Sequence, residues 1–312
     1  MGGVAQFALH GIVPPIVTPF RDDERIDYNA WQRIIDSLVS AGVDGLFVCG
    51  STGEFYALDA EERTVALRFC RQAAANRVTL YANVGCVTTR DTVSLALRAR
   101  DEGIGVLAVV TPYYTRISQE ELVNHYCEVC RSVGLPVLAY NYPQHGGSDL
   151  LPETVGRIAA ACENFVGIKD ASGNLERLLA YRRCAPGREL AVFVGPENLL
   201  LPALERGCAG AVTAGINVAP KLFVALYRAF RQGQPEEAAR LQALVDRLGR
   251  ALELHTFPGA VKEAMNLIGL PAGPCRRPVG PMPPEARAQL ALVLDNLRAE
   301  GYLPAATLLQ GA

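Results

Sequence analysis

Lys169 lies near the end of a short apolar run, Phe165–Asp170, and an earlier run of the same kind leads to Tyr140. A lysine that closes a buried strand is unfavourable because its ammonium resists leaving water, and burial lowers its pKa toward neutrality. The neutral amine is a nucleophile toward ketones, and a phenol on a neighbouring strand end supplies the proton transfers of imine formation. The pair predicts covalent amine catalysis; the alternative is an exposed lysine whose stem follows a strand end.

Polar side chains follow most of the apolar runs. They include one lysine and several hydroxyls but no cluster of metal ligands, so we expect neither a metal nor a cofactor. Neutral Lys169 would attack the ketone of a 2-oxo acid, and Tyr140 would give and take protons at the same carbon. The set at the run ends is Thr18, Ser51–Glu54, Asn83, Thr111–Tyr114, Tyr140–Pro143, Lys169–Asp170, Glu197–Asn198 and Thr213.

The segment from Ser51 to Gly53 predicts a turn whose backbone N–H groups hold the substrate carboxylate, with Gly53 allowing close approach. Ser51, Thr52 and Tyr114 would form a hydroxyl relay to solvent. The alternative for the turn is an ordinary strand-to-helix connection with Thr52 as a helix cap. For Tyr114 and its neighbour Tyr113 the alternative is packing at the rim of the fold.

Eight apolar, β-branched runs alternate with stretches of helical period, which predicts βαβ units and a parallel sheet. Eight such units favour a (β/α)8 TIM barrel over an open doubly wound sheet, and barrels place active-site residues at the carboxyl ends of their strands. The expected strand segments are Gly11–Thr18, Gly45–Gly50, Val78–Gly85, Val106–Pro112, Pro136–Pro143, Phe165–Asp170, Ala191–Pro196 and Gly210–Asn217.

Strand runs stop after about Pro220 and helical patterns take over. We therefore expect a barrel over residues 1–230 and a C-terminal helical appendage over residues 231–312. The expected helices are Lys221–Gln232, Pro235–Leu254, Pro258–Ile268 and Pro284–Glu300.

Bulk composition narrows the class of protein. Half of the 312 residues are hydrophobic and the net charge is −2 without a basic block, so no nucleic-acid partner is expected. The sequence has no run of about 18 apolar residues, so we expect no membrane-spanning helix. The N-terminal residues lack the pattern of a signal peptide, which makes the cytoplasm the expected location.

The CxxC pair Cys127 and Cys130 falls in a helical stretch, and core packing is favoured over a redox or metal role.

Four segments, in order across nearly the whole chain, resemble the pyruvate-dependent class I aldolases related to dihydrodipicolinate synthase and N-acetylneuraminate lyase. The segments are Gly50–Glu54, Thr111–Tyr114, Tyr140–Pro143 and Gly167–Asn174. The resemblance implies a (β/α)8 barrel with a C-terminal helical domain, pyruvate as one substrate, and a homotetramer built from tight dimers.

The resemblance also implies roles for single residues. Lys169 matches the Schiff-base lysine and Tyr140 the proton-transfer tyrosine. Ser51 matches a hydroxyl of the relay, and Tyr114 matches the relay tyrosine that reaches a neighbouring subunit's site. In addition, Thr52 matches a contact to the pyruvate carboxylate, and Val212 matches a backbone contact near pyruvate.

Departures from the family pattern concern the second substrate. His145 stands where dihydrodipicolinate synthases usually carry an arginine, and imidazole cannot replace a bidentate guanidinium. Sialic acid lyases usually carry Asp-Glu after the seventh strand and Ser on the eighth, whereas this chain has Glu197-Asn198 and Ala214. The pattern looks more like enzymes that act on 2-keto-3-deoxy sugar acids.

The leading hypothesis is a lyase that forms or cleaves a C–C bond through an imine on Lys169, with pyruvate and a small aldehyde or a keto-deoxy acid as substrates. One alternative is 4-hydroxy-tetrahydrodipicolinate synthase, and another is a keto-deoxy sugar acid dehydratase. All three use Lys169, Tyr140 and the same relay, so the sequence does not separate them. A non-catalytic protein that binds a 2-oxo acid would not need the intact lysine and hydroxyl set.

Overall fold

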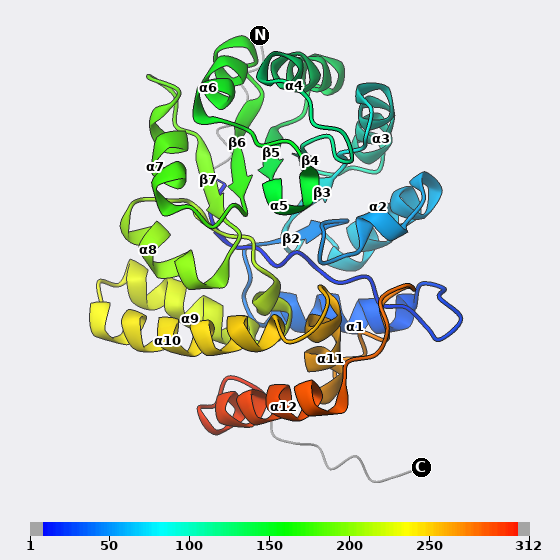
Figure 1. Ribbon diagram of the computed structural model, residues 1–312, viewed down its shortest axis with the longest axis vertical. Helices are drawn as coiled ribbons and strands as arrows, with labels where there is room; N and C mark the ends of the chain where they lie inside the picture. The colour runs from blue at the N-terminus through cyan, green and yellow to red at the C-terminus, as the bar shows by residue number, and fades with distance from the viewer. Residues whose placement is uncertain (1–8, 305–312) are drawn as a thin grey trace.

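The computed structural model of the chain describes residues 9–304. Its eight parallel strands follow one another in the order β1-β8-β7-β6-β5-β4-β3-β2, which runs round a ring and confirms the predicted (β/α)8 barrel (Figure 1). The strands are β1 (Gly11–Ile12), β2 (Gly45–Val48), β3 (Thr79–Asn83), β4 (Val106–Val110), β5 (Val137–Asn141), β6 (Phe165–Asp170), β7 (Ala191–Val194) and β8 (Gly210–Ala211).

The seam between the first and second strands is closed by a short bridge after β1. The N–H of Phe47 donates to the carbonyl of Pro14 at 2.9 Å, and the N–H of Ile16 donates to the carbonyl of Phe47 at 3.0 Å. Pro14 and Pro15 have no N–H to contribute, so a longer ladder cannot form there. The barrel is therefore closed by the least regular of its strand pairings.

Helices between the strands cover the outside of the barrel. Side-chain caps fix several of their starts: Asp59 and Ser118 each form a capping box with a glutamate three residues on. The helices are α1 (Tyr28–Ser40), α2 (Ala60–Ala74), α3 (Thr89–Asp101), α4 (Gln119–Val133), α5 (Pro143–Gly146), α6 (Pro152–Ala161), α7 (Leu175–Arg183), α8 (Leu200–Glu205) and α9 (Pro220–Arg231), with the 3-10 turns η1 (Phe55–Ala57), η2 (Glu197–Leu199) and η3 (Ala214–Asn217).

Three further helices follow the barrel: α10 (Pro235–Leu252), α11 (Gly259–Leu267) and α12 (Pro284–Ala299). They lie together on one side of the barrel, with α10 beside α9 and α12 farthest from the sheet (Figure 1). Each lies within two residues of the bounds expected from the sequence. The division into residues 1–230 and 231–312 stays a prediction, and residues 305–312 lie outside the described part of the chain.

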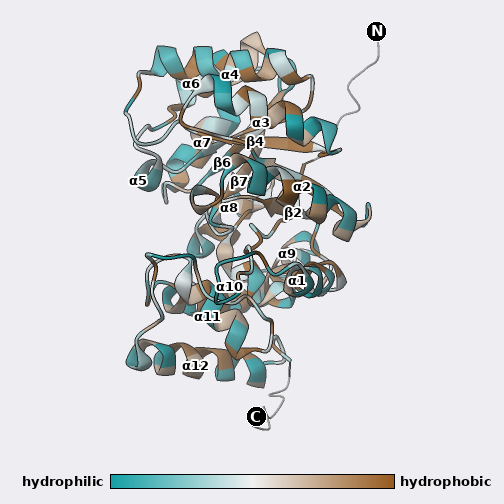
Figure 2. Ribbon diagram, turned by 90° about the vertical axis from the view of Figure 1, so that its right-hand side faces the viewer, coloured by the Kyte–Doolittle hydropathy of each residue, from teal (hydrophilic) through white to brown (hydrophobic). Residues whose placement is uncertain are grey.

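The core is apolar because the strands are buried on both faces. All five residues of β4 and all four of β2 are buried, and the strands form the hydrophobic centre of the molecule, while the outer helices carry more hydrophilic residues (Figure 2). Cys127 and Cys130 are buried on α4, in agreement with core packing. No helix within residues 9–304 is long and apolar enough to cross a membrane.

The last predicted strand, Gly210–Asn217, is much shorter than expected. Regular pairing ends at Ala211, and residues from Ala214 onward form η3 instead. The side chain of Asn217 replaces the missing strand contacts, because it donates to the carbonyl of Pro15 at 2.9 Å and accepts from the N–H of Val17 at 3.3 Å. The first predicted strand is shortened in the same way, with β1 ending at Ile12.

Candidate active site

The two neighbouring strands β5 and β6 place Tyr140 and Lys169 side by side. The two residues are direct partners in the parallel register, so their side chains point to the same face of the sheet, the inside of the barrel. Tyr140 is 2% exposed and Lys169 is 4% exposed. The sequence therefore buries an amine next to a phenol at the carboxyl ends of two strands.

Lys169 is surrounded by aromatic rings and has no ion-pair partner within residues 9–304. Its Nζ lies 4.0 Å from the ring centroid of Tyr140 and 4.9 Å from that of Phe47. Burial lowers the pKa of Lys169 to about 7, and the carboxylate of Glu197 opposes that shift only in part. A substantial fraction of the side chain is therefore the neutral, nucleophilic amine near neutral pH.

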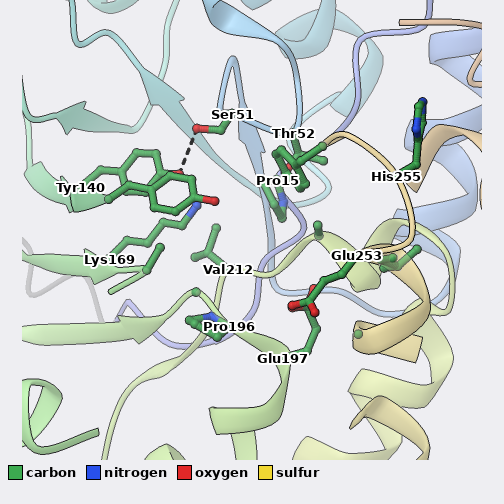
Figure 3. A pocket seen from close by; sticks show the side chains of 17 residues that line it. Pro15, Ser51, Thr52, Tyr140, Lys169, Pro196, Glu197, Val212, Glu253 and His255 are labelled. Carbon is green, nitrogen blue, oxygen red and sulfur yellow. Dashed lines mark hydrogen bonds between the residues drawn. The ribbon is translucent and has the colours of Figure 1, made fainter. Parts of the chain in front are cut away.

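The hydroxyl of Tyr140 forms a hydrogen bond with the hydroxyl of Ser51, whose oxygen lies 3.1 Å away. Burial raises the pKa of Tyr140, and the bond to Ser51 opposes this shift. The phenol is therefore protonated near neutral pH and can donate a proton, while Ser51 can pass protons between the phenol and the cavity. Figure 3 shows this bond and the lysine beside the Tyr140 ring.

The turn from Ser51 to Gly53, which follows β2, has the geometry of an anion site. None of its three backbone N–H groups donates to an acceptor in the described part of the chain. Cys49 (φ 55°), two residues before the turn, and Glu54 (φ 54°), directly after it, have left-handed backbone conformations that are costly for non-glycine residues. Successive free N–H groups held in a strained turn form a cradle for a carboxylate or phosphate.

A cavity of about 360 Å³ connects these groups. It opens between the strand ends of the barrel and the end of α10, so both parts of the chain contribute to its wall (Figure 3). The lining residues are Pro15, Ser51, Thr52, Tyr140, Tyr142, Lys169, Ala171, Gly195, Pro196, Glu197, Val212, Ala214, Gly249, Leu252, Glu253, His255 and Phe257.

The end of the cavity away from Lys169 is acidic. The carboxylates of Glu197 and Glu253 approach one another there (Figure 3). Glu197 accepts a hydrogen bond from the N–H of Gly215 at 2.9 Å, and burial raises its pKa, with Glu253 adding to the shift. Glu253 is the C-cap of α10, where a negative charge is unfavourable because it lies at the negative end of the helix dipole.

Six of the nine predicted site residues line this one cavity. They are Lys169, Tyr140, Ser51, Thr52, Val212 and Glu197. Their proximity follows from the barrel, but their chemical roles stay predictions.

The other three predicted residues lie elsewhere. His145 lines an adjacent cavity of about 270 Å³, and the centroid of its ring lies 4.3 Å from that of Tyr142, a residue that lines both cavities. Gly53 does not line the main cavity; a side chain there would lie 2.8 Å from the carbonyl of Ile16, which is a packing reason for glycine. Tyr114 is 96% exposed, so its role in a relay depends on contact with a second subunit.

Several lining residues have no signal in the sequence. Glu253, His255 and Phe257 follow α10, far from any strand end, and reach the cavity only because the helical region packs on the open end of the barrel. Their types alone match surface helix and loop positions. Within residues 9–304, no group of three His, Cys, Asp or Glu side chains could hold a metal ion.

Comparisons with known proteins identify the family of this chain. The model of the dihydrodipicolinate synthetase family matches residues 8–297. A 4-hydroxy-tetrahydrodipicolinate synthase of Methanothrix thermoacetophila is 34% identical over 289 residues, covering 93% of this chain and 97% of that protein. An Escherichia coli protein named as a probable 2-dehydro-3-deoxy-D-pentonate aldolase, YjhH, is 35% identical over 300 residues, covering 94% and 98%.

Among solved structures, the crystal structure of the E. coli prophage protein YagE in complex with pyruvate superposes with a TM-score of 0.90. It is 34% identical, and the match covers 94% of this chain and 99% of that one. The predicted family, the barrel and the assignment to the lyases are thereby confirmed. With the family model and both relatives matching along nearly its whole length, this chain belongs to the dihydrodipicolinate synthetase family.

Proposed function

We propose that this chain is a lyase in which Lys169 forms an imine with pyruvate, or with the keto group of a 2-keto-3-deoxy acid, to make or break a C–C bond. The observation that carries the proposal is the buried Lys169, which has no ion-pair partner among residues 9–304 and packs against the tyrosine that shares a hydrogen bond with Ser51. A lysine in this setting is activated for attack on a carbonyl carbon.

The chemical steps use groups already in the cavity. The neutral amine of Lys169 attacks the keto carbon, and a proton moves from nitrogen to oxygen to give a carbinolamine. The phenol of Tyr140 donates a proton to the carbinolamine hydroxyl, which leaves as water, and the nitrogen lone pair forms the imine. In its protonated form the imine accepts the electron pair of the adjacent bond, so that a C–H or C–C bond breaks and an enamine forms.

The substrate carboxylate would bind at the Ser51–Gly53 turn. Its free N–H groups supply donors, and Thr52 lines the cavity at this point. Binding there holds the keto carbon at a fixed distance from the carboxylate, which places it for attack by Lys169. This supports a 2-oxo acid over a simple ketone as the first substrate.

The acidic far end of the cavity favours a neutral, hydroxylated second substrate. Glu197 and Glu253 accept hydrogen bonds from hydroxyl groups but repel a second carboxylate. Lys169 is the one Lys or Arg among the residues that line the cavity. The tail of a 2-keto-3-deoxy sugar acid fits this lining better than an aspartate-derived semialdehyde, which disfavours 4-hydroxy-tetrahydrodipicolinate synthase. A dehydratase would use the same imine and the same lining.

Assembly belongs to the same proposal. Tyr114 has a left-handed backbone (φ 76°), is 96% exposed and does not line the cavity of its own chain. In a tight dimer this side chain would enter the partner's site and complete the hydroxyl relay, and two such dimers would form the expected homotetramer. The cytoplasmic location stays a prediction from the sequence.

The test is reduction with borohydride in the presence of pyruvate, followed by peptide mass mapping. A reduced pyruvate adduct on Lys169 supports the proposal. A folded sample without an adduct would contradict it and would favour a 2-oxo acid binding protein. The untreated enzyme is then assayed with keto-deoxy sugar acids and, together with pyruvate, with aldehydes that do or do not carry a carboxylate. The substrates that it turns over separate the substrate classes.

The adjacent cavity offers a second check on the aldehyde partner. His145→Arg adds a guanidinium beside Tyr142, at the edge of the site. If the second substrate reaches this cavity, the variant should use a carboxylate-bearing aldehyde several-fold better relative to a neutral one. An unchanged ratio of the two kcat/KM values would remove His145 from the site.

A further inference from the structure

A buried ion pair joins the Ser51–Gly53 turn to the helical region. Glu54, the residue after the turn, and Lys262, in the middle of α11, each have side chains that are 1% exposed. The Oε1 of Glu54 lies 2.5 Å from the Nζ of Lys262. The two charges are far apart in the sequence and come from the barrel and from the helical region, so the pair forms only when the two parts are docked.

Contacts around the pair come mainly from the helical side. The backbone N–H of Arg276 donates to the Oε2 of Glu54 at 3.0 Å, and Lys262 donates to the carbonyl of Pro274 at 2.8 Å. The Nζ of Lys262 also lies 4.3 Å from the ring centroid of Phe20. Both ends of the pair are thus fixed in position by the segment that follows α11.

The same segment holds the chain on the far side of Glu54. The guanidinium of Arg276 donates to the carbonyl of Ala57 at 2.6 Å and pairs with Glu62 at the start of α2. Gly273 passes so close to Phe20 that a side chain on it would lie 1.9 Å from the Phe20 carbonyl. The helical region therefore contacts the residues after the turn at several points, and the ion pair is the contact nearest to the turn.

The backbone of Glu54 controls the turn itself. Its N–H donates to the carbonyl of Ser51 at 3.1 Å, and its left-handed conformation is unfavourable unless the surroundings hold it. The hydroxyl of Thr18 donates a hydrogen bond to the carbonyl of Gly53 at 2.8 Å. Without the pull of Lys262 on its side chain, Glu54 has less to keep it in this conformation.

We propose that Lys262 is a positioning residue for substrate binding: acting through Glu54, it holds the Ser51–Gly53 turn in the shape that binds the carboxylate of a 2-oxo acid. Docking of the helical region thereby sets the affinity of the barrel for its first substrate. The inference rests on the proposed function, because it needs pyruvate to bind at that turn.

A double-mutant cycle tests this inference. The variants are Lys262→Met, Glu54→Gln and the two combined, and the measured quantities are the pyruvate concentration that half-saturates borohydride trapping on Lys169 and the maximal trapping rate. We expect each single variant and the double variant to raise the half-saturating concentration about ten-fold, with maximal rates within about three-fold of the unsubstituted protein. Equal effects in all three are the sign of two residues that act as one unit.

Arg277→Ala is the matched control, because Arg277 lies next to Arg276 but makes an exposed pair with Glu24 and does not contact Glu54. It should trap pyruvate like the unsubstituted protein. If Lys262→Met does not fold, the double variant still reports, since it leaves no unpaired charge in the interior.

Three outcomes would overturn the inference. One is a folded variant of the cycle with an unchanged half-saturating concentration, another is a loss confined to the maximal rate, and the third is single effects that multiply in the double variant. If the unsubstituted protein forms no adduct at all, the proposed function fails first and the inference falls with it. An adduct in that protein, together with unchanged variants, overturns the inference alone.

Discussion

The sequence contains three lysines, and two of them, Lys169 and Lys262, are buried in contrasting surroundings. Both ammonium groups lie over aromatic rings, at 4.0 Å from Tyr140 and 4.3 Å from Phe20. Burial lowers the pKa of both. The aromatic neighbours therefore do not distinguish the two side chains.

A nearby carboxylate distinguishes the two lysines. Glu54 lies 2.5 Å from Lys262 and opposes the effect of burial, whereas Lys169 has no ion-pair partner among the described residues. Removing water without supplying a counter-charge makes an amine reactive, and supplying the counter-charge makes it a structural cation. We therefore expect substitutions at the two lysines to have different effects on turnover and on stability.

Turnover should separate the two lysines most strongly. Lys169→Met should lower kcat by at least about 10⁴-fold, because the nucleophile is lost, while Lys262→Met should keep a kcat within about three-fold of the unsubstituted protein. Steady-state kinetics on the best substrate of the screen measures both. Comparable losses in kcat would mean that the two lysines do not differ in the way described.

Stability should change in opposite directions. Lys262→Met should destabilise the fold by about 3–5 kcal/mol, because the carboxylate of Glu54 stays buried without its partner. Lys169→Met should stabilise it by about 2–4 kcal/mol at pH 7, because folding no longer has to bury a group that prefers to be charged. Urea denaturation of both variants is the measurement, and two changes of the same sign would contradict the comparison.

The gain from Lys169→Met should depend on pH. The folded-state pKa of about 7 lies below the usual lysine value of 10.5, so the unfolded chain binds more protons between those values. The cost of burying Lys169 is therefore complete below about pH 7 and is lost as the pH rises toward 10.5. Unfolding free energies at pH 7 and pH 9.5 should show the advantage of the variant shrinking; a constant advantage would place the pKa of Lys169 elsewhere.

Tyr140→Phe keeps the ring beside Lys169 and removes its hydroxyl. It should lower kcat by about 10²–10³-fold, because proton transfer to and from the carbinolamine loses its donor, while the fold stays intact. Ser51→Ala, which leaves the phenol in place, is the milder companion. Unchanged turnover in Tyr140→Phe would assign the proton transfers to another group.

Glu197→Gln should give the smallest effect. The carboxylate of Glu197 raises the pKa of Lys169, so its removal should shift the pH midpoint of imine formation to lower pH. The shift should be less than about one unit, since Glu197 makes no direct pair with the lysine. A shift to higher pH would mean that this carboxylate does not act on Lys169 through its charge.

The surroundings of Lys169 could be predicted from the sequence, whereas those of Lys262 could not. Lys169 ends an apolar run, and the side-chain direction of strand residues makes its burial and its proximity to Tyr140 readable from the chain. The barrel and the helices α9 to α12 were also predictable, because the periodicity of apolar residues that indicates each strand and helix is local in the sequence. The seams at β1 and β8 were not, because Pro14, Pro15 and the side chain of Asn217 replace regular strand pairing there.

The burial of Lys262 could not be predicted from the sequence either. This lysine lies within an amphipathic helix, where lysines are usually exposed, and only the docking of that helix against Glu54 buries it. Glu253 and His255 reach the cavity for the same reason. Contacts between the barrel and the helical region depend on packing between distant segments, and neither composition nor spacing encodes that packing locally.

The pH dependence of imine formation on Lys169 shows most directly whether burial activates this amine. Single-turnover mixing with pyruvate from about pH 5.5 to about pH 10, quenched into borohydride and followed by peptide mapping, gives the rate at each pH. We expect the adduct to form on Lys169 alone and its rate of formation to rise with pH, with a midpoint near pH 7. A midpoint above about pH 9.5, the range of an ordinary lysine, would show that burial does not activate this amine.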